Sequence, residues 1–187
     1  GRALLITASG PDLVVFDASS NLWRWRPSDG AGKGTLVKLR VRDGELWGSD
    51  VKAIIGFAAD SGTGLYRLYV VDPSARQILR YQPAPDGTGY PATPTAYLIN
   101  PMSLGTMTGI AIDGDVYMTS GGALRRYSGG APDEWTPAEI GDELLRPLLT
   151  PTVVMSAGAS RTGIIYVWDS SARRVIAYSK ASSGAML

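Results

Sequence analysis

The sequence predicts an all-β protein, and three observations support this prediction. One strand–turn–strand pattern recurs four times within the 187 residues. The 23 glycines and 12 prolines indicate many turns between short strands. The recurrence has a period close to the roughly 40–50 residues of a propeller blade. The predicted fold is therefore a single β-propeller domain over residues 1–187, with about four blades of antiparallel meander.

The second half of each repeat is an apolar strand, a polar turn, and a strand that closes on an aromatic residue. The four copies read VVFDASSNLWRW (14–25), LYVVDPSARQILRY (68–81), VYMTSGGALRRY (116–127) and IYVWDSSARRVIAY (165–178). Their closing aromatics are Trp25, Tyr81, Tyr127 and Tyr178. Large aromatic side chains at a repeated strand position are expected to pack between neighbouring blades.

Each copy is preceded by a further apolar strand and a turn rich in Gly, Asp and Ser. These strands are predicted at Ala3–Ala8, Ile54–Ala59, Gly109–Ile112 and Val153–Ala157. Because nearly every residue in the first two strands of each repeat is apolar, the sheets are expected to be covered on both faces. This favours blades packed face to face over a two-sheet sandwich, in which most strands would alternate.

The predicted fourth strands are less uniform. Thr35–Val41 alternates apolar and basic residues, as an outer strand with one wet face does, and Thr95–Ile99 is the second candidate. In the third repeat, a capping box at 136–139 and helical spacing up to Leu148 indicate a short helix or irregular insert. The tail after Tyr178 is too polar for a fourth strand. The expected repeats are 3–50, 51–104, 105–150 and 151–187.

Composition excludes several classes of function. The net charge of +1 argues against a nucleic-acid-binding module, which usually carries a basic excess. The chain has no cysteine and no histidine, which removes thiol catalysis, the Ser-His-Asp triad and imidazole metal ligands. No apolar run approaches the ~18 residues that would insert into a membrane. No metal site and no cofactor are predicted.

The segment GIAIDGDVYMTSGGALRRY, at 109–127, resembles the repeat of NHL-type and TolB-like β-propeller proteins. The copies at 68–81 and 165–178 match the second half of that repeat, with Asp72 and Asp169 at the end of the strand. The copy at 14–25 matches more loosely through Asp17, and Ser120 replaces the Asp in the third copy. The resemblance implies four-stranded blades, often six to a ring, and an extracytoplasmic sensor or scaffold role.

Four repeats leave the completeness of the ring open. The chain is a segment of a longer, six-bladed propeller, or its four blades close alone, or two chains combine as a homo-oligomer. An incomplete ring or a segment is the preferred interpretation, since the first repeat starts with its first strand and the last stops after its third.

The candidate site residues each have a structural and a functional interpretation. Asp17, Asp72 and Asp169 form a ring of carboxylates that either holds a cation or, as preferred, caps the turn after each strand. Arg24, Arg80 and Arg126 precede the closing aromatics. They are candidates for binding an anion, although pairing between blades is the preferred interpretation.

Trp47 and Trp135 are the other binding candidates, because they fall in loops rich in Gly, Pro and Asp, where packing does not obviously require them. The function favoured by these observations is a non-catalytic propeller domain that binds a protein or a small-molecule ligand. The alternative is a propeller hydrolase or lyase with carboxylates and a metal in the central channel. A purely structural spacer is a third possibility.

Overall fold

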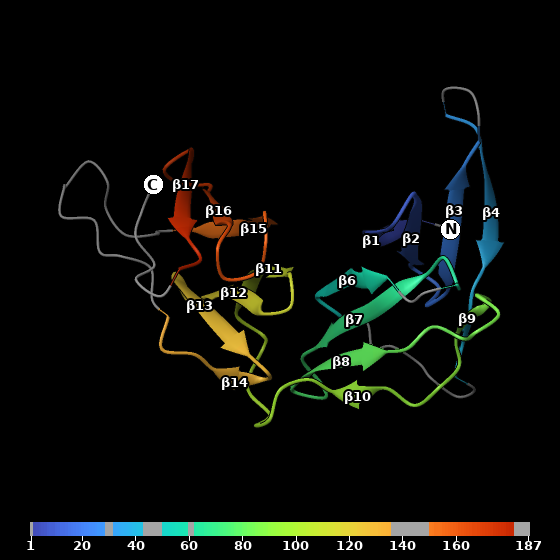
Figure 1. Cartoon of the computed structure of the whole chain (residues 1–187), viewed down its shortest axis with the longest axis horizontal. Helices are drawn as coiled ribbons and strands as arrows, with labels where there is room; N and C mark the ends of the chain where they lie inside the picture. Colours follow the sequence, from blue (N-terminus) through green and yellow to red (C-terminus); the bar gives the residue numbers. More distant parts are fainter. Residues whose placement is uncertain (1, 29–31, 43–49, 60–61, 136–149, 182–187) are drawn as a thin grey trace. The chain divides into compact units, whose positions relative to one another are not determined.

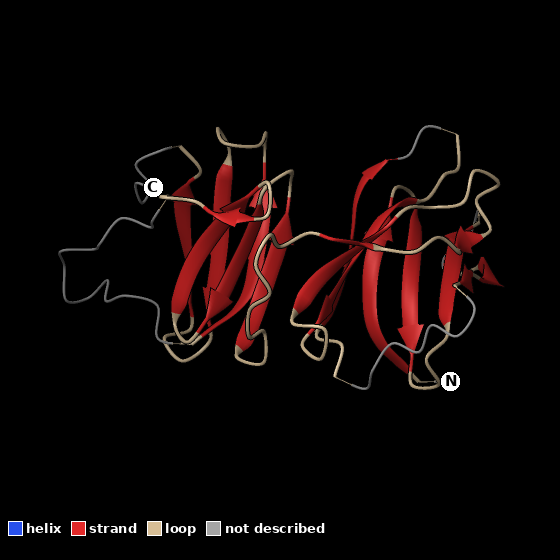
Figure 2. Cartoon of the chain, turned by 90° about the horizontal axis from the view of Figure 1, so that it is seen from below, coloured by secondary structure: helices blue, strands red, loops and turns tan. Residues whose placement is uncertain are grey.

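A computed structural model describes residues 2–28, 32–42, 50–59, 62–135 and 150–181. Strands, turns and loops make up all of these residues (Figure 2). No helix long and apolar enough to span a bilayer occurs among them. The chain divides into two compact units, Gly1–Tyr97 (unit 1) and Leu98–Leu187 (unit 2). The fold is of the β-propeller class, with four antiparallel blades, two in each unit (Figure 1).

The first blade of unit 1 is a four-stranded meander in the order β1-β2-β3-β4. Its strands are β1 (Ala3–Ser9), β2 (Asp12–Asp17), β3 (Leu22–Pro27) and β4 (Gly34–Lys38). Gly10 has a φ of 60° in the tight turn between the first two strands, a conformation that glycine adopts without strain.

The second blade has the order β10-β8-β7-β6. Its strands are β6 (Ala53–Ala59), β7 (Tyr66–Asp72), β8 (Gln77–Tyr81) and β10 (Thr95–Ala96). A separate short pair, β5 (Arg40–Val41) with β9 (Gly89–Tyr90), runs parallel. This pair ties the chain that leaves the first blade to the loop that follows β8.

Unit 2 contains the third and fourth blades. The third has the order β11-β12-β13-β14, and the fourth has three described strands in the order β15-β16-β17. The strands are β11 (Met107–Ile112), β12 (Val116–Ser120), β13 (Ala123–Ser128), β14 (Ala131–Pro132), β15 (Pro151–Ala157), β16 (Ile164–Asp169) and β17 (Arg174–Ser179).

The first three strands of every blade lie where the sequence predicts them, but the fourth strands differ. The predicted Thr35–Val41 strand divides, because Leu39 turns inward and is only 3% exposed. Its amide still donates to the carbonyl of Leu22, and from Arg40 on the chain pairs with β9 instead of β3. The predicted Thr95–Ile99 strand keeps only Thr95–Ala96.

In the third blade the fourth strand lies earlier than predicted, at Ala131–Pro132. A turn through Gly129 and Gly130 with φ values of 57° and 85° brings the chain straight back onto β13. Two successive positive φ angles define the tight hairpin turn that glycine pairs favour. The predicted helix or insert at 136–148 lies outside the described residues. In the fourth blade no fourth strand follows Ser179 among the described residues.

Each unit has its core between its two blades. In unit 1, fully buried residues of both blades, such as Val14 and Leu68, belong to one hydrophobic cluster. Gly56 of β6 lies so close to β1 that a Cβ added to it would be 2.3 Å from the carbonyl oxygen of Ala8. In unit 2 the corresponding cluster joins Tyr117 of the third blade to Tyr178 of the fourth.

The expectation that the first strands are covered on both faces is wrong for β1 and β15. Leu4 and Ile6 of β1 are 46% and 59% exposed, and Val153 and Met155 of β15 are 46% and 62% exposed. The physical reason is that only one face of each of these strands packs on a neighbouring blade of its own unit.

Candidate functional site

The carboxylates at the ends of the second strands stabilise turns. Asp17 accepts hydrogen bonds from the amides of Ser19 and Asn21, both at 2.9 Å, and from Trp23 Nε1 at 2.8 Å. These bonds lower the pKa of Asp17 to about 2, the bond from the Asn21 amide contributing most. The predicted turn-capping role is thus confirmed for Asp17.

Asp72 and Asp169 also bind backbone amides. Asp72 accepts from the amide of Ala75 at 3.0 Å, and Asp169 accepts from the amide of Thr150 at 3.0 Å. Among the described residues, no group of three or more Asp, Glu, His or Cys side chains has a geometry that could hold a metal ion.

The three candidate arginines lie in three different blades and are not brought together. Arg24 forms an ion pair with the fully buried carboxylate of Asp12, and its Nη2 donates to the carbonyl of Gly64 in the second blade at 3.2 Å. Arg80 donates from Nε to the hydroxyl of Thr95 in its own blade at 3.2 Å.

Arg126 bridges the blades of unit 2. Its Nε donates to Asp133 at 3.0 Å, and its Nη1 donates to the carbonyl of Lys180, beyond β17, at 2.8 Å. The preferred interpretation, pairing between blades, is therefore observed for Arg24 and Arg126. An anion-binding role for the three arginines stays a prediction.

Trp135 is only 2% exposed and packs inside unit 2. Its ring lies edge-on to Tyr117 at a centroid distance of 5.5 Å, and the Arg126 guanidinium lies 5.5 Å from its centre. Its Nε1 donates to the carbonyl of Ser179 at 3.1 Å. These contacts are those of a side chain that joins two blades, while its predicted role in ligand binding stays a prediction. Trp47 lies outside the described residues.

Unit 1 carries a groove of about 470 Å³ along the end of the first blade. Four basic side chains line it, together with shorter residues from the loop before β9. The lining comprises Arg24, Arg26, Thr35, Val37, Lys38, Leu39, Arg40, Gly87 and Thr88. We call this hollow the basic groove. Its volume lies within the ~300–1,000 Å³ that is usual for ligand sites.

Two basic side chains of the groove are held in place by one buried carboxylate. Asp12 binds Arg24 and also receives Arg26 Nε on its other oxygen at 3.1 Å. Burial alone would raise the pKa of Asp12, but the hydrogen bonds and charges of the two arginines outweigh burial and lower that pKa. The Arg26 side chain remains 59% exposed, so it presents a fixed, solvated guanidinium to the groove.

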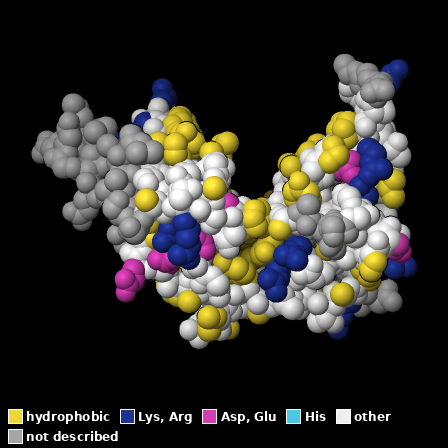
Figure 3. Space-filling model, viewed as in Figure 1, with side chains coloured by type: hydrophobic (Ala, Val, Ile, Leu, Met, Phe, Trp, Pro, Cys, Tyr) yellow, Lys and Arg dark blue, Asp and Glu magenta, His cyan; other side chains and the backbone are white. Residues whose placement is uncertain are grey.

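Lys38 and Arg40 supply the other two charges, and both are exposed. Lys38 Nζ lies 6.0 Å from the centre of the Trp23 ring. Between them Leu39 points inward, and a second hollow lined by Lys38, Leu39, Arg40, Val41 and Pro91 continues past them. Figure 3 shows Lys and Arg side chains gathered over β3 beside acidic atoms.

The carboxylate of Asp86 lies near Arg40 but already accepts two bonds from Thr88. These come from the Thr88 amide at 3.1 Å and its hydroxyl at 2.7 Å. Of the four basic groups, Arg24 and Arg26 share the buried carboxylate of Asp12. Four positive charges against two negative ones still leave the groove with an excess of positive charge, which suits an anionic ligand.

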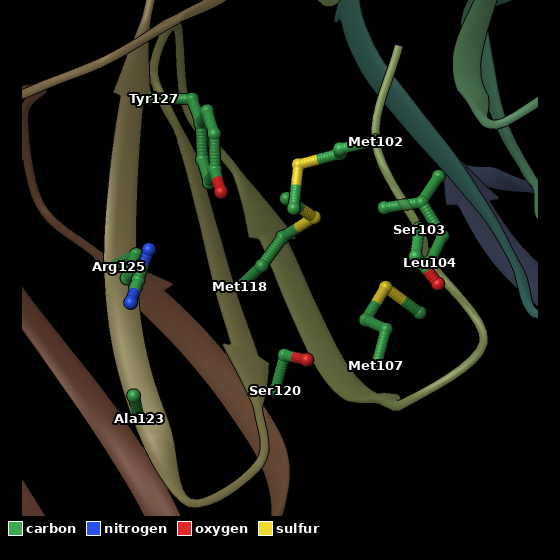
Figure 4. Close-up of a pocket in the computed structure, with 9 residues that line it drawn as sticks. All are labelled: Met102, Ser103, Leu104, Met107, Met118, Ser120, Ala123, Arg125 and Tyr127. Carbon is green, nitrogen blue, oxygen red and sulfur yellow. The ribbon is translucent and has the colours of Figure 1, made fainter.

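Unit 2 has a smaller, sulfur-rich hollow of about 200 Å³ on the third blade (Figure 4). Met102, Met107 and Met118 approach one another there, with Tyr127 and Arg125 at the β13 side. Flexible methionine side chains fill irregular spaces in cores, and this volume is below the usual size of a ligand site. We interpret the hollow as a packing gap.

No known protein family matches this chain, and no curated protein matches it in sequence. Among solved structures, it is similar to the crystal structure of a Bacteroides fragilis protein thought to be exported. The two are 13% identical, and the match covers 96% of this chain and 71% of the other, with a TM-score of 0.37. A likeness this distant supports no statement about activity, and membership of the NHL-type or TolB-like proteins stays a prediction.

Arg26, Lys38 and Arg40 were not among the candidate residues. The signal for two of them is present in the sequence, because Lys38 and Arg40 alternate with apolar residues in the stretch TLVKLRV. That alternation predicts a solvent-exposed strand face, but it does not predict that Arg24 and Arg26 of the preceding strand lie beside that face. Their proximity depends on the pairing of β3 with β4.

Proposed function

We propose that this chain is a non-catalytic β-propeller domain with a binding or scaffold role, and that the basic groove of unit 1 holds an acidic segment of a protein partner. The observation that carries the proposal is the arrangement of four basic side chains around one hollow of suitable volume. Asp12 fixes two of them in advance, so little side-chain entropy is lost when a ligand binds.

The engagement of the described carboxylates supports a non-catalytic role. Asp17 and Asp72 accept from turn amides, and Asp169 accepts from the Thr150 amide and pairs with Arg174. Asp12 and Asp133 bind arginines. A carboxylate whose oxygens already accept hydrogen bonds or pair with an arginine is poorly suited to transferring a proton or activating water.

An extended acidic peptide fits the groove better than a compact anion, because the second hollow continues the surface past Arg40. β4 is also the outer strand of its blade, and every residue of it is exposed. An extended segment that binds there can reach both the basic side chains and an unpaired strand edge.

The proposal is tested by fluorescence anisotropy with a labelled hexaglutamate peptide at low ionic strength. We expect saturable binding that weakens as salt is added, since the contacts are between exposed charges. The double variant Lys38→Glu/Arg40→Glu should weaken binding about tenfold or more, because each lost ion pair contributes roughly 0.2–1 kcal/mol and each reversal adds repulsion.

The matched control is Arg2→Glu/Lys52→Glu, which changes the charge of unit 1 equally at two exposed positions outside the groove. This variant should bind within about twofold of the unchanged chain. No binding at low salt, or equal weakening by the two double variants, would show that the groove is not the ligand site.

A further inference from the structure

Two blade faces, one in each unit, carry exposed apolar side chains in ordered rows. On the first blade the cross-strand rows are Ile6–Val15–Trp23–Lys38 and Ala8–Leu13–Trp25–Leu36, apolar except for Lys38 at the edge. Ile6 and Leu36 in these rows are 59% and 58% exposed. We call this surface the first-blade face; it is the side of the sheet that carries the closing aromatic Trp25.

On the fourth blade the rows are Val153–Trp168–Val175 and Met155–Tyr166–Ala177. Met155 and Val175 are 62% and 61% exposed. We call this surface the fourth-blade face; it is the side opposite the closing aromatic Tyr178. Figure 3 shows hydrophobic side chains at the surface over β1 and β2 and over β15 and β16.

The same two kinds of face pack on each other inside both units. In unit 1 the side of the second blade with its closing aromatic, including Leu68 and Tyr81, packs on the opposite side of the first blade, including Val14 and Phe16. In unit 2 the corresponding side of the fourth blade, with Ile165 and Tyr178, packs on Tyr117 and Ala111 of the third. Each of these contacts therefore joins the side of one blade that carries its closing aromatic to the side of the neighbouring blade that does not.

The first-blade face carries its closing aromatic and the fourth-blade face is the side without one. These two faces are therefore complementary in the same way as the faces that pack inside each unit. Contiguous exposed apolar side chains of this kind mark an interaction site in a folded protein. Apart from Lys38 at the edge of the first blade, the rows are regular and apolar, so the partner that fits each of them is another propeller blade with the complementary side.

We propose that the occupant is a second copy of this chain, whose fourth-blade face packs on the first-blade face of its partner, and the reverse. Two such contacts are related by a two-fold axis, the commonest symmetry of homo-oligomers. Two copies together hold eight blades, which is within the typical range of about 4–8 for propellers.

The fourth-blade face differs from its equivalents in one residue that bears on the contact. Arg24 and Arg126 occupy this position in the first and third blades and donate to carbonyls of the next blade. Ala177 stands there in the fourth blade, so its row is wholly apolar. Association through this face is therefore driven by hydrophobic burial and should change little with salt.

The experiment measures the mass of the chain in solution by light scattering after size exclusion. We expect twice the mass of one chain, and the same mass at low and high salt. Ile6→Asp on the first-blade face and Met155→Asp on the fourth-blade face should each give the mass of a single chain. Both positions are exposed, so thermal unfolding should confirm that the variants remain folded.

Mixing the two variants provides the decisive test. Ile6→Asp retains an intact fourth-blade face and Met155→Asp retains an intact first-blade face, so the mixture should recover a species of two chains. Ile99→Asp is the matched control, because Ile99 is 66% exposed but belongs to neither face; it should leave the mass unchanged.

A single-chain mass for the unchanged protein at high concentration would overturn the proposal, as would two variants that stay dimeric or a mixture that recovers nothing. Lys38 belongs to both the first-blade face and the basic groove, so the two proposals are separated at positions that belong to one surface only. Ile6→Asp or Met155→Asp should abolish self-association and leave hexaglutamate binding intact, and Arg40→Glu should weaken that binding and leave the mass unchanged.

Discussion

Replacement of Lys180 by Met should destabilise unit 2 more than a change at any exposed lysine. The Lys180 side chain is 0% exposed, and its Nζ lies 2.6 Å from Asp113 Oδ2 in the turn of the third blade. Nζ also donates to the carbonyl of Ala157 in the fourth blade at 2.9 Å. One ammonium group thus joins the turns of two blades.

The magnitude follows from what Lys180→Met leaves behind. The Asp113 carboxylate, which is 10% exposed, would keep Ser156 Oγ at 2.6 Å as a partner but would lose its cation. Breaking a buried ion pair by removing one member costs about 3–5 kcal/mol. Met has nearly the same length, so lost packing should add little.

The assay is hydrogen exchange of the β16 and β17 amides, which reports the free energy of opening in unit 2. The second variant, Lys180→Met/Asp113→Asn, removes both charges and should recover part of the loss. Arg125→Met, at an exposed basic residue of the same unit, should change the free energy by less than about 0.5 kcal/mol. A loss below about 1 kcal/mol for Lys180→Met would refute the view that this pair joins the blades.

Two further predictions concern unit 1. Asp17 has a pKa lowered to about 2 in the folded chain, so its contribution to stability is present above its ordinary pKa of 3.8 and is lost as pH falls toward 2. In denaturant titrations, Asp17→Asn should therefore flatten the fall of the unfolding midpoint between pH 4 and pH 2. An unchanged pH profile would contradict this role. Gly56→Ala places a Cβ 2.3 Å from the Ala8 carbonyl oxygen and should lower the free energy of unfolding by about 1–3 kcal/mol. Gly105→Ala, in unit 2, has open space around the added Cβ and no positive φ, so it should cost less in the same thermal melts.

Much of the fold could be predicted because the repeat is strongly patterned. The apolar strands recur in all four repeats, and the turn after the second strand starts at Asp17, Asp72 and Asp169 in three of them, so one interpretation of the strands serves all four blades. The fourth strands were harder, because they are short and depend on tertiary contacts. The alternation in TLVKLRV places Leu39 on the inner face, but nothing local shows that the chain leaves β3 after it and pairs with β9 from Arg40 on.

The candidate site was less accessible to sequence reasoning. Arg24, Arg80 and Arg126 occupy one repeated position, and such a position places residues in different blades instead of in one site. The basic groove instead combines neighbours across strands β3 and β4 with a loop residue, Thr88, from the second blade. The residues that come together in such a site depend on the register between strands and on where the loops lie. Neither can be predicted from the local sequence pattern.

The most direct test of the proposed function is a titration of the isotopically labelled chain with unlabelled hexaglutamate, followed by amide chemical shifts in NMR spectra. The account predicts that the largest shifts occur at Lys38, Leu39, Arg40 and Thr88, and that they vanish at high salt. Shifts that are absent, or that concentrate in blades away from the groove, would contradict it.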